Sequence, residues 1–249
     1  MMMKIIKVTD YEEMSQTACN IILGKVKDKK HLVLGLATGS TPEGLYRCMI
    51  QAYKEGKISF QNIVTFNLDE YLNLHQDHPN SYHHYMKKKF FDHIDIPKKN
   101  IHLPDGMATS YIQECQQYDE KIRRAGNIDI QVLGLGVNGH IGFNEPGTSF
   151  KIRTHVVNLD QITRKTNSKF FRDIQDVPKK AITMGIANIM ESKEILLLVS
   201  GKKKELALAR LINEEISEQF PASILKRHQN VTIIADRAAL PNLCKENRH

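Results

Sequence analysis

Apolar and polar positions divide the chain into short apolar runs separated by longer stretches with helical spacing. The apolar runs predict buried strands at residues 4–8, 31–37, 63–68, 128–135, 194–199 and 231–235. Between them, helices are expected at residues 11–27 (capped by Asp10), 42–55, 86–91, 112–124, 161–171 and 203–213. Strands that alternate with helices of this length are typical of right-handed βαβ units, so the sequence predicts an α/β fold with a mostly parallel sheet.

No internal repeat, low-complexity tract or Ser/Gly linker interrupts this alternation. A length of 249 residues is enough for one large α/β domain, and residues 1–249 are expected to form one. The 41% hydrophobic and 25% charged content is that of an ordinary globular protein and argues against disorder.

A cytoplasmic location without a membrane partner is expected. The longest apolar runs, such as Ile195 to Val199, are too short to cross a bilayer, and the start of the chain lacks a signal peptide's apolar stretch and cleavage site. The four cysteines are widely scattered without a CxxC pair, which favours free thiols in a reducing compartment.

The formal net charge of +7 fits either an anionic substrate or a nucleic acid. The basic runs at 87–89 and 202–204 sit beside apolar helix residues and lack the aromatic platforms of single-strand binders. We therefore expect a small anionic substrate and no nucleic-acid partner.

Ligands of parallel α/β sheets bind beyond the carboxyl ends of the strands, so the loops that follow strands are the candidate sites. The first such loop holds Thr38, Gly39, Ser40 and Thr41, and Pro42 suits the start of the helix behind it. Backbone N–H groups, hydroxyls and a helix N-terminus together form an anion cradle, although an ordinary capped β–α turn would look the same.

The second loop places two carboxylates, Asp69 and Glu70, directly after an apolar strand. Neighbouring strand residues point in different directions, so only one of the two easily faces a given site. Asp69 follows Leu68, and apolar surroundings could raise its pKa toward the range of a useful base. The alternative for Asp69 is a helix N-cap.

The third loop, residues 134–147, contains GxGxxG after a strand, which superficially matches a dinucleotide fingerprint. In a Rossmann turn a helix opens at this point, but here Gly142, Pro146 and Gly147 fall where its first turns would be. The sequence therefore favours an extended loop that presents His140 and Glu145, and argues against a nicotinamide cofactor.

A metal site is a competing interpretation of the four histidines His75, His78, His83 and His84. Pro79 and Asn80 break any common helix, and no nearby cysteine or HExxH motif completes a zinc set. Exposed loop histidines are the alternative, and we expect no bound metal.

Taken together, the three loops resemble the glucosamine-6-phosphate deaminase family, within a larger group that includes 6-phosphogluconolactonases. The segments that carry the resemblance are LGLATGSTPEGLY, TFNLDEYLNL, HPNSYHHYM, GLGVNGHIGFNEPG, TNSKFF, ITMGI and SGKKKELAL, which cover nearly the whole chain in the family's order. The resemblance implies a Rossmann-like three-layer α/β/α sandwich without a dinucleotide. The LDEY and GHIGFNEP loops favour the deaminases over the lactonases.

The resemblance also assigns roles to single residues. Asp69 matches the family's proton-transferring base, His140 its ring-opening histidine, and Glu145 the carboxylate that orients and charges that histidine. Asn138 stands where some members have Asp, and its amide can still hold the histidine. The residues that match phosphate-binding elements are Thr38, Gly39, Ser40, Thr41 and Lys204, with Lys169 in a mobile lid around 155–180. Lys169 stands where Arg is usual, and lysine lacks the bidentate fork of arginine.

The implied reaction converts D-glucosamine 6-phosphate and water to D-fructose 6-phosphate and ammonia and needs no cofactor. A lactonase or isomerase acting on another sugar phosphate, and a non-catalytic sugar-phosphate sensor, remain alternatives. Hexameric members bind an N-acetylated effector through a basic patch, where this chain carries His155 and Val157. We therefore expect a monomer or small homo-oligomer that N-acetylglucosamine 6-phosphate does not activate.

Overall fold

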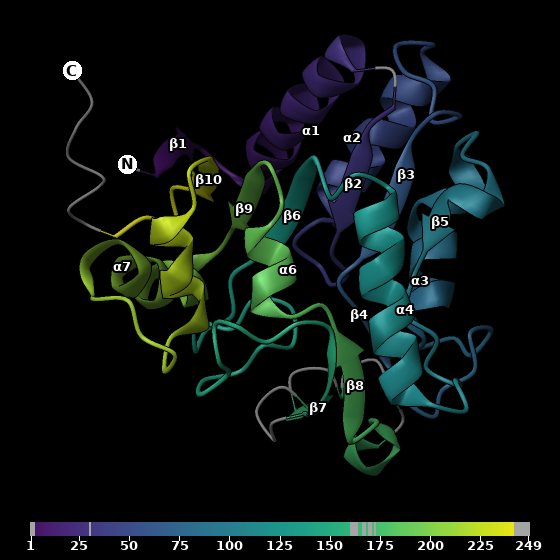
Figure 1. Cartoon of the computed structure of the whole chain (residues 1–249). Coiled ribbons are helices and arrows are strands. Elements are labelled where there is room, and N and C mark those ends of the chain that lie inside the picture. Colours follow the sequence, from purple (N-terminus) through teal and green to yellow (C-terminus); the bar gives the residue numbers. More distant parts are fainter. Residues whose placement is uncertain are drawn as a thin grey trace, which may run out of the picture.

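The computed structural model describes residues 3–29, 31–159, 164–165, 168, 171 and 173–241. Its central feature is a seven-stranded sheet in the order β1-β10-β9-β6-β2-β3-β5, in which every strand pair is parallel. The strands of this sheet are β1 (Lys4–Val8), β2 (Val33–Leu36), β3 (Val64–Asn67), β5 (Ile101–His102), β6 (Ile130–Gly134), β9 (Ile195–Val199) and β10 (Val231–Asp236). The predicted parallel sheet is confirmed (Figure 1).

Helices cover both faces of this sheet and form the outer layers. One face packs against α1 (Tyr11–Asp28), α2 (Glu43–Lys54) and α3 (Tyr82–Lys89). The other face packs against α4 (Tyr111–Arg124), α6 (Ile186–Met190), α7 (Glu205–Asn213) and a 3-10 helix at Pro221–Arg227. This is the expected α/β/α sandwich.

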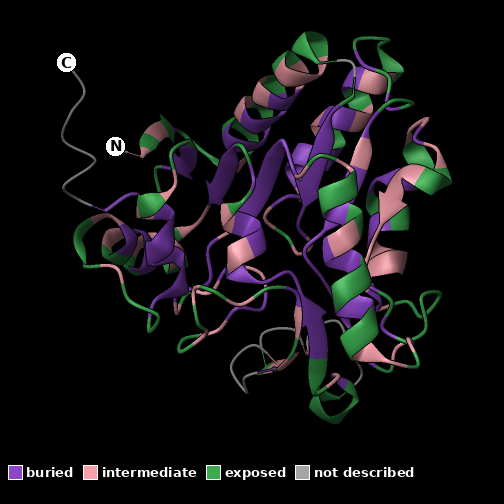
Figure 2. Ribbon diagram, in the orientation of Figure 1, coloured by how far each residue is buried: buried purple, intermediate pink, exposed green. Residues whose placement is uncertain are grey.

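Successive side chains of each strand point to opposite faces of the sheet, so each strand contributes to the hydrophobic cores on both faces. In β9, Leu196 and Leu198 belong to the core beneath α1 and α2, whereas Ile195, Leu197 and Val199 belong to the opposite core. Because both faces are covered, the inner strands β2, β6, β9 and β10 are almost entirely buried, whereas the edge strands β1 and β5 are partly exposed. Figure 2 shows the buried inner strands and the exposed outer sides of the helices. Each of the six predicted strands contains a cluster of apolar residues, which is unbroken in β9.

A second, antiparallel sheet was not predicted. It consists of β4 (Asp69–Tyr71), β8 (Lys180–Thr183) and β7 (His155–Asn158), in the order β4-β8-β7. One residue, Leu68, separates β3 from β4, so this sheet extends from the carboxyl end of β3. It lies beneath the main sheet in Figure 1.

The helix predictions are confirmed at most positions. Asp10 caps α1 as expected, because its side chain accepts a hydrogen bond from the backbone N–H of Glu13 at 2.9 Å. The expected helix at 86–91 is wrong in its bounds, since α3 begins at Tyr82 and ends at Lys89. The expected helix at 161–171 and the proposed lid around 155–180 lie partly outside the described residues. No helix in the described ranges is long and apolar enough to cross a membrane.

Candidate active site

The strand order brings the predicted loops to one edge of the main sheet. Strands β9, β6, β2 and β3 are neighbours and run parallel, so their carboxyl ends lie side by side. The loop after β2 holds residues 38–41, the loop after β6 holds His140, β4 continues from β3, and Lys204 follows β9. This edge is therefore the candidate active site.

Asp69 is a buried carboxylate at the start of β4, with only 6% of the residue exposed. Within the described part of the chain, no hydrogen bond reaches its carboxylate. Burial, and secondarily the negative charge of Glu70, raises the pKa of Asp69 to about 8. The helix N-cap alternative is wrong, because Asp69 lies in a strand and pairs with Thr183 of β8.

The glycine-rich loop passes directly beside Asp69. Gly142 has a φ of +57°, and a Cβ atom at this position would lie 3.6 Å from Asp69 Oδ2 and 3.1 Å from Thr183 Oγ1. The backbone N–H of Phe143 donates to Thr183 Oγ1 at 3.1 Å. Residues 135–154 form turns and no helix, as predicted, so GxGxxG here does not have the context of a dinucleotide site.

His140, Asn138 and Glu145 form a hydrogen-bonded chain within this loop. Asn138 Nδ2 donates to Glu145 Oε2 at 2.7 Å, and Asn138 Oδ1 lies 2.7 Å from His140 Nδ1. Because a carboxylate only accepts, the amide nitrogen of Asn138 faces Glu145 and its oxygen faces the histidine. His140 then carries its proton on Nδ1 and leaves Nε2 free to accept another.

The direct partner of His140 is thus Asn138 rather than Glu145. Glu145 Oε2 lies 3.5 Å from His140 Nδ1, beyond the Asn138 contact, so the carboxylate acts on the histidine mainly through the amide. The loop packs closely around the ring, because a Cβ atom on Gly136 would come within 2.4 Å of His140 Cγ. Glycine at 136 is therefore required for this position of the ring.

Three tyrosines hold the turn after β2 by its carbonyl groups. Their hydroxyls donate to the carbonyl oxygens of Ala37, Gly39 and Ser40, and come from Tyr46 of α2, Tyr85 of α3 and Tyr11 of α1 respectively. These hydrogen bonds orient the carbonyl groups of Ala37, Gly39 and Ser40 toward the tyrosine hydroxyls. No local sequence pattern indicates these contacts, although Tyr85 lies in the segment HPNSYHHYM that carries the family resemblance.

The N–H groups of the same turn are free to bind an anion. Gly39 adopts a φ of +94°, which glycine reaches without strain. Within the described residues, no acceptor is found for the backbone N–H groups of Gly39, Ser40 and Thr41. Unpaired N–H groups just before the N-terminus of α2 are a suitable site for a phosphate group.

Lys204 ends a 3-10 turn at Lys202–Lys204 and immediately precedes α7. Burial lowers the pKa of its ammonium group, as expected for a cation held partly out of water. Its position after β9 places it on the same edge as the turn. Lys169 lies outside the described residues, so its predicted phosphate contact stays a prediction.

Three of the four histidines proposed for a metal site make other side-chain contacts. His83 Nδ1 lies 2.8 Å from Glu70 Oε2, whereas the Nδ1 atoms of His75 and His78 accept hydrogen bonds from nearby backbone N–H groups. Across the described ranges, no three His, Cys, Asp or Glu side chains are grouped to hold a metal ion. The geometry therefore gives the metal interpretation no support.

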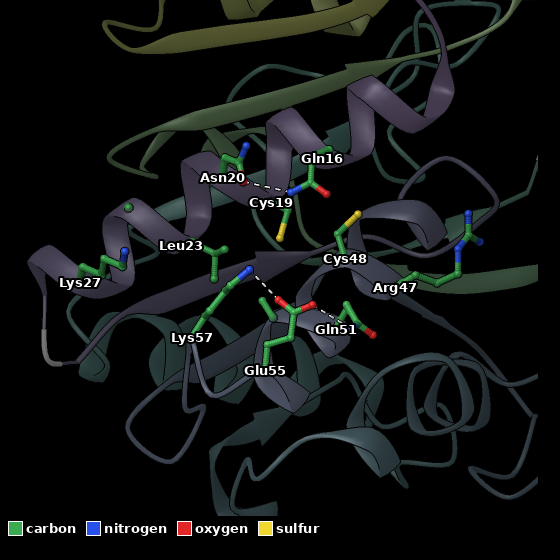
Figure 3. A pocket seen from close by; sticks show the side chains of 12 residues that line it. Gln16, Cys19, Asn20, Leu23, Lys27, Arg47, Cys48, Gln51, Glu55 and Lys57 are labelled. Carbon is green, nitrogen blue, oxygen red and sulfur yellow. Dashed lines mark hydrogen bonds and ion pairs between the residues drawn. The ribbon is translucent and has the colours of Figure 1, made fainter.

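A separate hollow of about 710 Å³ lies between α1 and α2 (Figure 3). Its lining includes Cys19, Cys48 and Lys57, but none of the predicted site residues. Burial raises the pKa of the Cys19 thiol to about 12, so this thiol stays protonated and unreactive near neutral pH. The hollow therefore contributes no chemistry to the candidate site.

Comparison with known proteins agrees with the sugar-phosphate chemistry that the geometry of the site suits. The family model described as glucosamine-6-phosphate isomerases/6-phosphogluconolactonase matches residues 9–234. A glucosamine-6-phosphate deaminase of Oceanobacillus iheyensis is 58% identical over 97% of this chain and 96% of its own length. The glucosamine-6-phosphate deaminase 1 of Bacillus subtilis is 52% identical over 95% of this chain and 98% of its own.

Solved structures extend the comparison. One described as a monomeric glucosamine-6-phosphate deaminase superposes with a TM-score of 0.94 at 52% identity, over 95% of this chain and 98% of the other. A 6-phosphogluconolactonase of Thermotoga maritima has a TM-score of 0.74 at 22% identity, over 94% and 98% of the two chains, and shares the fold alone. The chain therefore belongs to the glucosamine-6-phosphate isomerase/6-phosphogluconolactonase family.

Proposed function

We propose that this chain is a glucosamine-6-phosphate deaminase that acts in amino-sugar catabolism. The observation that carries the proposal is the pairing of Asp69, a buried carboxyl whose pKa is raised to about 8, with the His140 loop that passes beside it at Gly142. A base next to the loop that carries a proton-shuttling imidazole suits an aldose–ketose type proton transfer. The near-full-length identity to deaminases supports the same activity.

The first step is opening of the pyranose ring. A proton must move between the ring oxygen O5 and the hydroxyl on C1, and His140 Nε2 is available for this because Nδ1 is fixed by Asn138. Glu145 stabilises the imidazolium form through Asn138, to which it is hydrogen-bonded at 2.7 Å. The open chain then carries an aldehyde at C1 and an amine at C2.

Asp69 transfers the second proton. Its carboxylate removes the hydrogen from C2 while the oxygen on C1 takes up a proton that the C2 ammonium group loses, which gives an enol-type intermediate across C1 and C2. The proton held by Asp69 is then delivered to C1. Carbon C2 is left as an iminium group, which takes up water and releases ammonia. Carbon C1 is reduced as C2 is oxidised within the same sugar, so the step balances without an external oxidant or reductant.

The phosphate group serves as a handle at the other end of the sugar. The free N–H groups of Gly39, Ser40 and Thr41, with the hydroxyl groups of the turn and the ammonium group of Lys204, would bind it. Binding energy gathered at the phosphate can hold C1 and C2 against Asp69.

The direct test is release of ammonia from glucosamine 6-phosphate by protein treated with a chelator, with fructose 6-phosphate measured in parallel. We expect both products in equal amounts. Asp69→Asn should reduce the rate about 10³-fold, within the range of a general base. Hydrolysis of 6-phosphogluconolactone without ammonia release, or turnover by Asp69→Asn near the parent rate, would contradict the assignment.

We further propose that the protein is monomeric, or a small oligomer at most, and is not activated by N-acetylglucosamine 6-phosphate. The similar solved structure is described as a monomer, and His155 and Val157 of β7 are not the basic residues of an anionic effector site. Light scattering should give a mass near 28.5 kDa. A sigmoidal rate curve that the effector makes hyperbolic would contradict the proposal.

A further inference from the structure

Glu70 is a buried carboxylate that the reaction described above does not use. Only 1% of the residue is exposed, and it follows Asp69 directly in β4. Successive strand residues point to opposite sides, so Asp69 faces Gly142 and Thr183 while Glu70 faces α3. A buried carboxylate away from the substrate requires a different role.

The contacts of Glu70 lie at the N-terminus of α3. Glu70 Oε1 accepts from the backbone N–H of Tyr71 at 2.8 Å and of Tyr82 at 2.9 Å, and Oε2 accepts from the backbone N–H of His83 at 2.9 Å. His83 Nδ1 lies 2.8 Å from the same Oε2. Ser81, the N-cap, accepts from His84 N at 3.0 Å. Glu70 therefore ties the first turn of α3 to β4.

The helix that Glu70 holds in turn fixes the anion-binding turn. The hydroxyl of Tyr85 donates to the carbonyl oxygen of Gly39 at 2.7 Å. The hydroxyl of Tyr82 lies close enough to the side chain of Thr38 to be influenced by it electrostatically. A continuous set of contacts thus leads from Asp69 through Glu70 and α3 to residues 38–41.

We propose that Glu70 is a positioning residue that sets the anion-binding turn, Thr38–Thr41, at a fixed distance from Asp69 by holding the N-terminus of α3. Glu70 itself touches no substrate. Phosphate binding at the turn and proton transfer at Asp69 then depend on one side chain, which links the two ends of the sugar. The proposal rests on the proposed function for its substrate, but its link between Glu70 and phosphate binding is independent of turnover.

The charge of Glu70 gives a second measurable effect, on the pKa of Asp69, which a purely structural role of Glu70 would not produce. Its negative charge is the second cause, after burial, of the raised pKa of Asp69. Among the described residues, Tyr46 of α2, Tyr82 of α3 and Tyr118 of α4 also interact electrostatically with Asp69. Burial raises the pKa values of these tyrosines, so they are neutral near pH 7. Removing the charge of Glu70 should therefore lower the pKa of Asp69.

The test is Glu70→Gln, compared with Glu114→Gln. Glu114 is the matched control, because it is also buried (8% exposed) and accepts a backbone N–H, from Asp105 at 3.0 Å, but lies on α4. Affinity for inorganic phosphate is measured by calorimetry, and kcat/KM for the sugar phosphate is measured against pH. We expect Glu70→Gln to weaken phosphate binding about tenfold, as for loss of a charge-assisted contact. We also expect it to move the acid limb of the pH profile, where kcat/KM falls as the pH is lowered, to lower pH. Glu114→Gln should match the parent in both.

Parent-like phosphate affinity and an unchanged acid limb in folded Glu70→Gln would overturn the proposal. A lowered melting temperature with unchanged phosphate affinity and an unchanged acid limb would also overturn the proposal, because it would show that Glu70 has a purely structural role. If Glu70→Gln does not fold, Tyr85→Phe removes the next contact of the chain. It should weaken phosphate binding and leave the acid limb in place, and parent-like affinity would overturn the proposal. Phosphate binding without any deamination would contradict the proposed function alone.

Discussion

Replacement of Asp69 by asparagine tests the buried carboxyl group through the stability of the fold, independently of turnover. Burial and the charge of Glu70 raise the pKa of Asp69 from 3.8 to about 8 in the folded chain. Between these two pH values the folded state keeps a proton that the unfolded chain has released. Unfolding then releases a proton, so the parent protein loses stability as the pH rises through this window.

The size of the effect follows from the pKa shift. Each pH unit inside the window lowers the free energy of unfolding by about 1.4 kcal/mol. The contribution of Asp69 is fully present below pH 3.8 and is lost by about pH 8, a total of about 6 kcal/mol. Asparagine has a similar size and does not ionise. The advantage of Asp69→Asn over the parent should therefore grow from about 2 kcal/mol at pH 5 to about 4 kcal/mol at pH 7.

The assay is urea unfolding followed by circular dichroism at several pH values between 5 and 8.5. Only the difference between variant and parent is interpreted, because the contributions of other titrating groups then cancel. Asp77→Asn serves as a control, since the Asp77 side chain is 77% exposed and its replacement should leave the pH dependence unchanged. A variant–parent difference that stays constant from pH 5 to 8 would refute the argument, and with it the assignment of Asp69 as a base with a raised pKa.

The remaining predictions concern the other groups of the site. The acid limb of kcat/KM should lie near pH 8, with about a tenfold loss per pH unit below it, because Asp69 must lose its proton to act. Asn138→Leu should lower kcat about 10²-fold in steady-state assays, since His140 loses its 2.7 Å partner, whereas Asn138→Asp still accepts from His140 and should retain turnover. Lys204→Met should raise KM for the sugar phosphate about tenfold and leave the binding of unphosphorylated glucosamine unchanged. Asn144→Leu should lower the free energy of unfolding by about 3 kcal/mol in urea titrations, because Asn144 Nδ2 donates to the buried carbonyl groups of Ile141 and Met184.

The main sheet could be predicted because its strands are covered on both faces. The run from Ile195 to Val199 is apolar at every position, and shorter or interrupted apolar runs mark the five other predicted strands. The two-residue β5 is too short to give such a signal. The β4-β8-β7 sheet joins segments about one hundred residues apart, as in the pairing of Asp69 with Thr183, and no local pattern encodes that contact.

The start of α3 shows the same limit for a helix. The apolar spacing favours a helix from Met86, but the structure begins it at Tyr82, after the cap at Ser81. Residues Tyr82 to Tyr85 are polar aromatic or histidine positions with weak helical preference. Their first turn is stabilised by Glu70, twelve residues before Tyr82, so the helix begins earlier than its own sequence indicates.

The two adjacent carboxylates also explain why the site residues could be named but their division of labour could not. The sequence offers a base or a helix cap for Asp69, whereas in the structure it is Glu70 that contacts the first turn of α3. Glu70 accepts hydrogen bonds from backbone N–H groups of α3. Asp69 receives no hydrogen bond from the described residues, and its pKa is raised. The pleat of β4 makes this separation, since it directs one carboxylate to helix donors and the other to the substrate side. Because the donors of α3 are satisfied by Glu70, the carboxyl group of Asp69 keeps the raised pKa that its proposed role as a base requires.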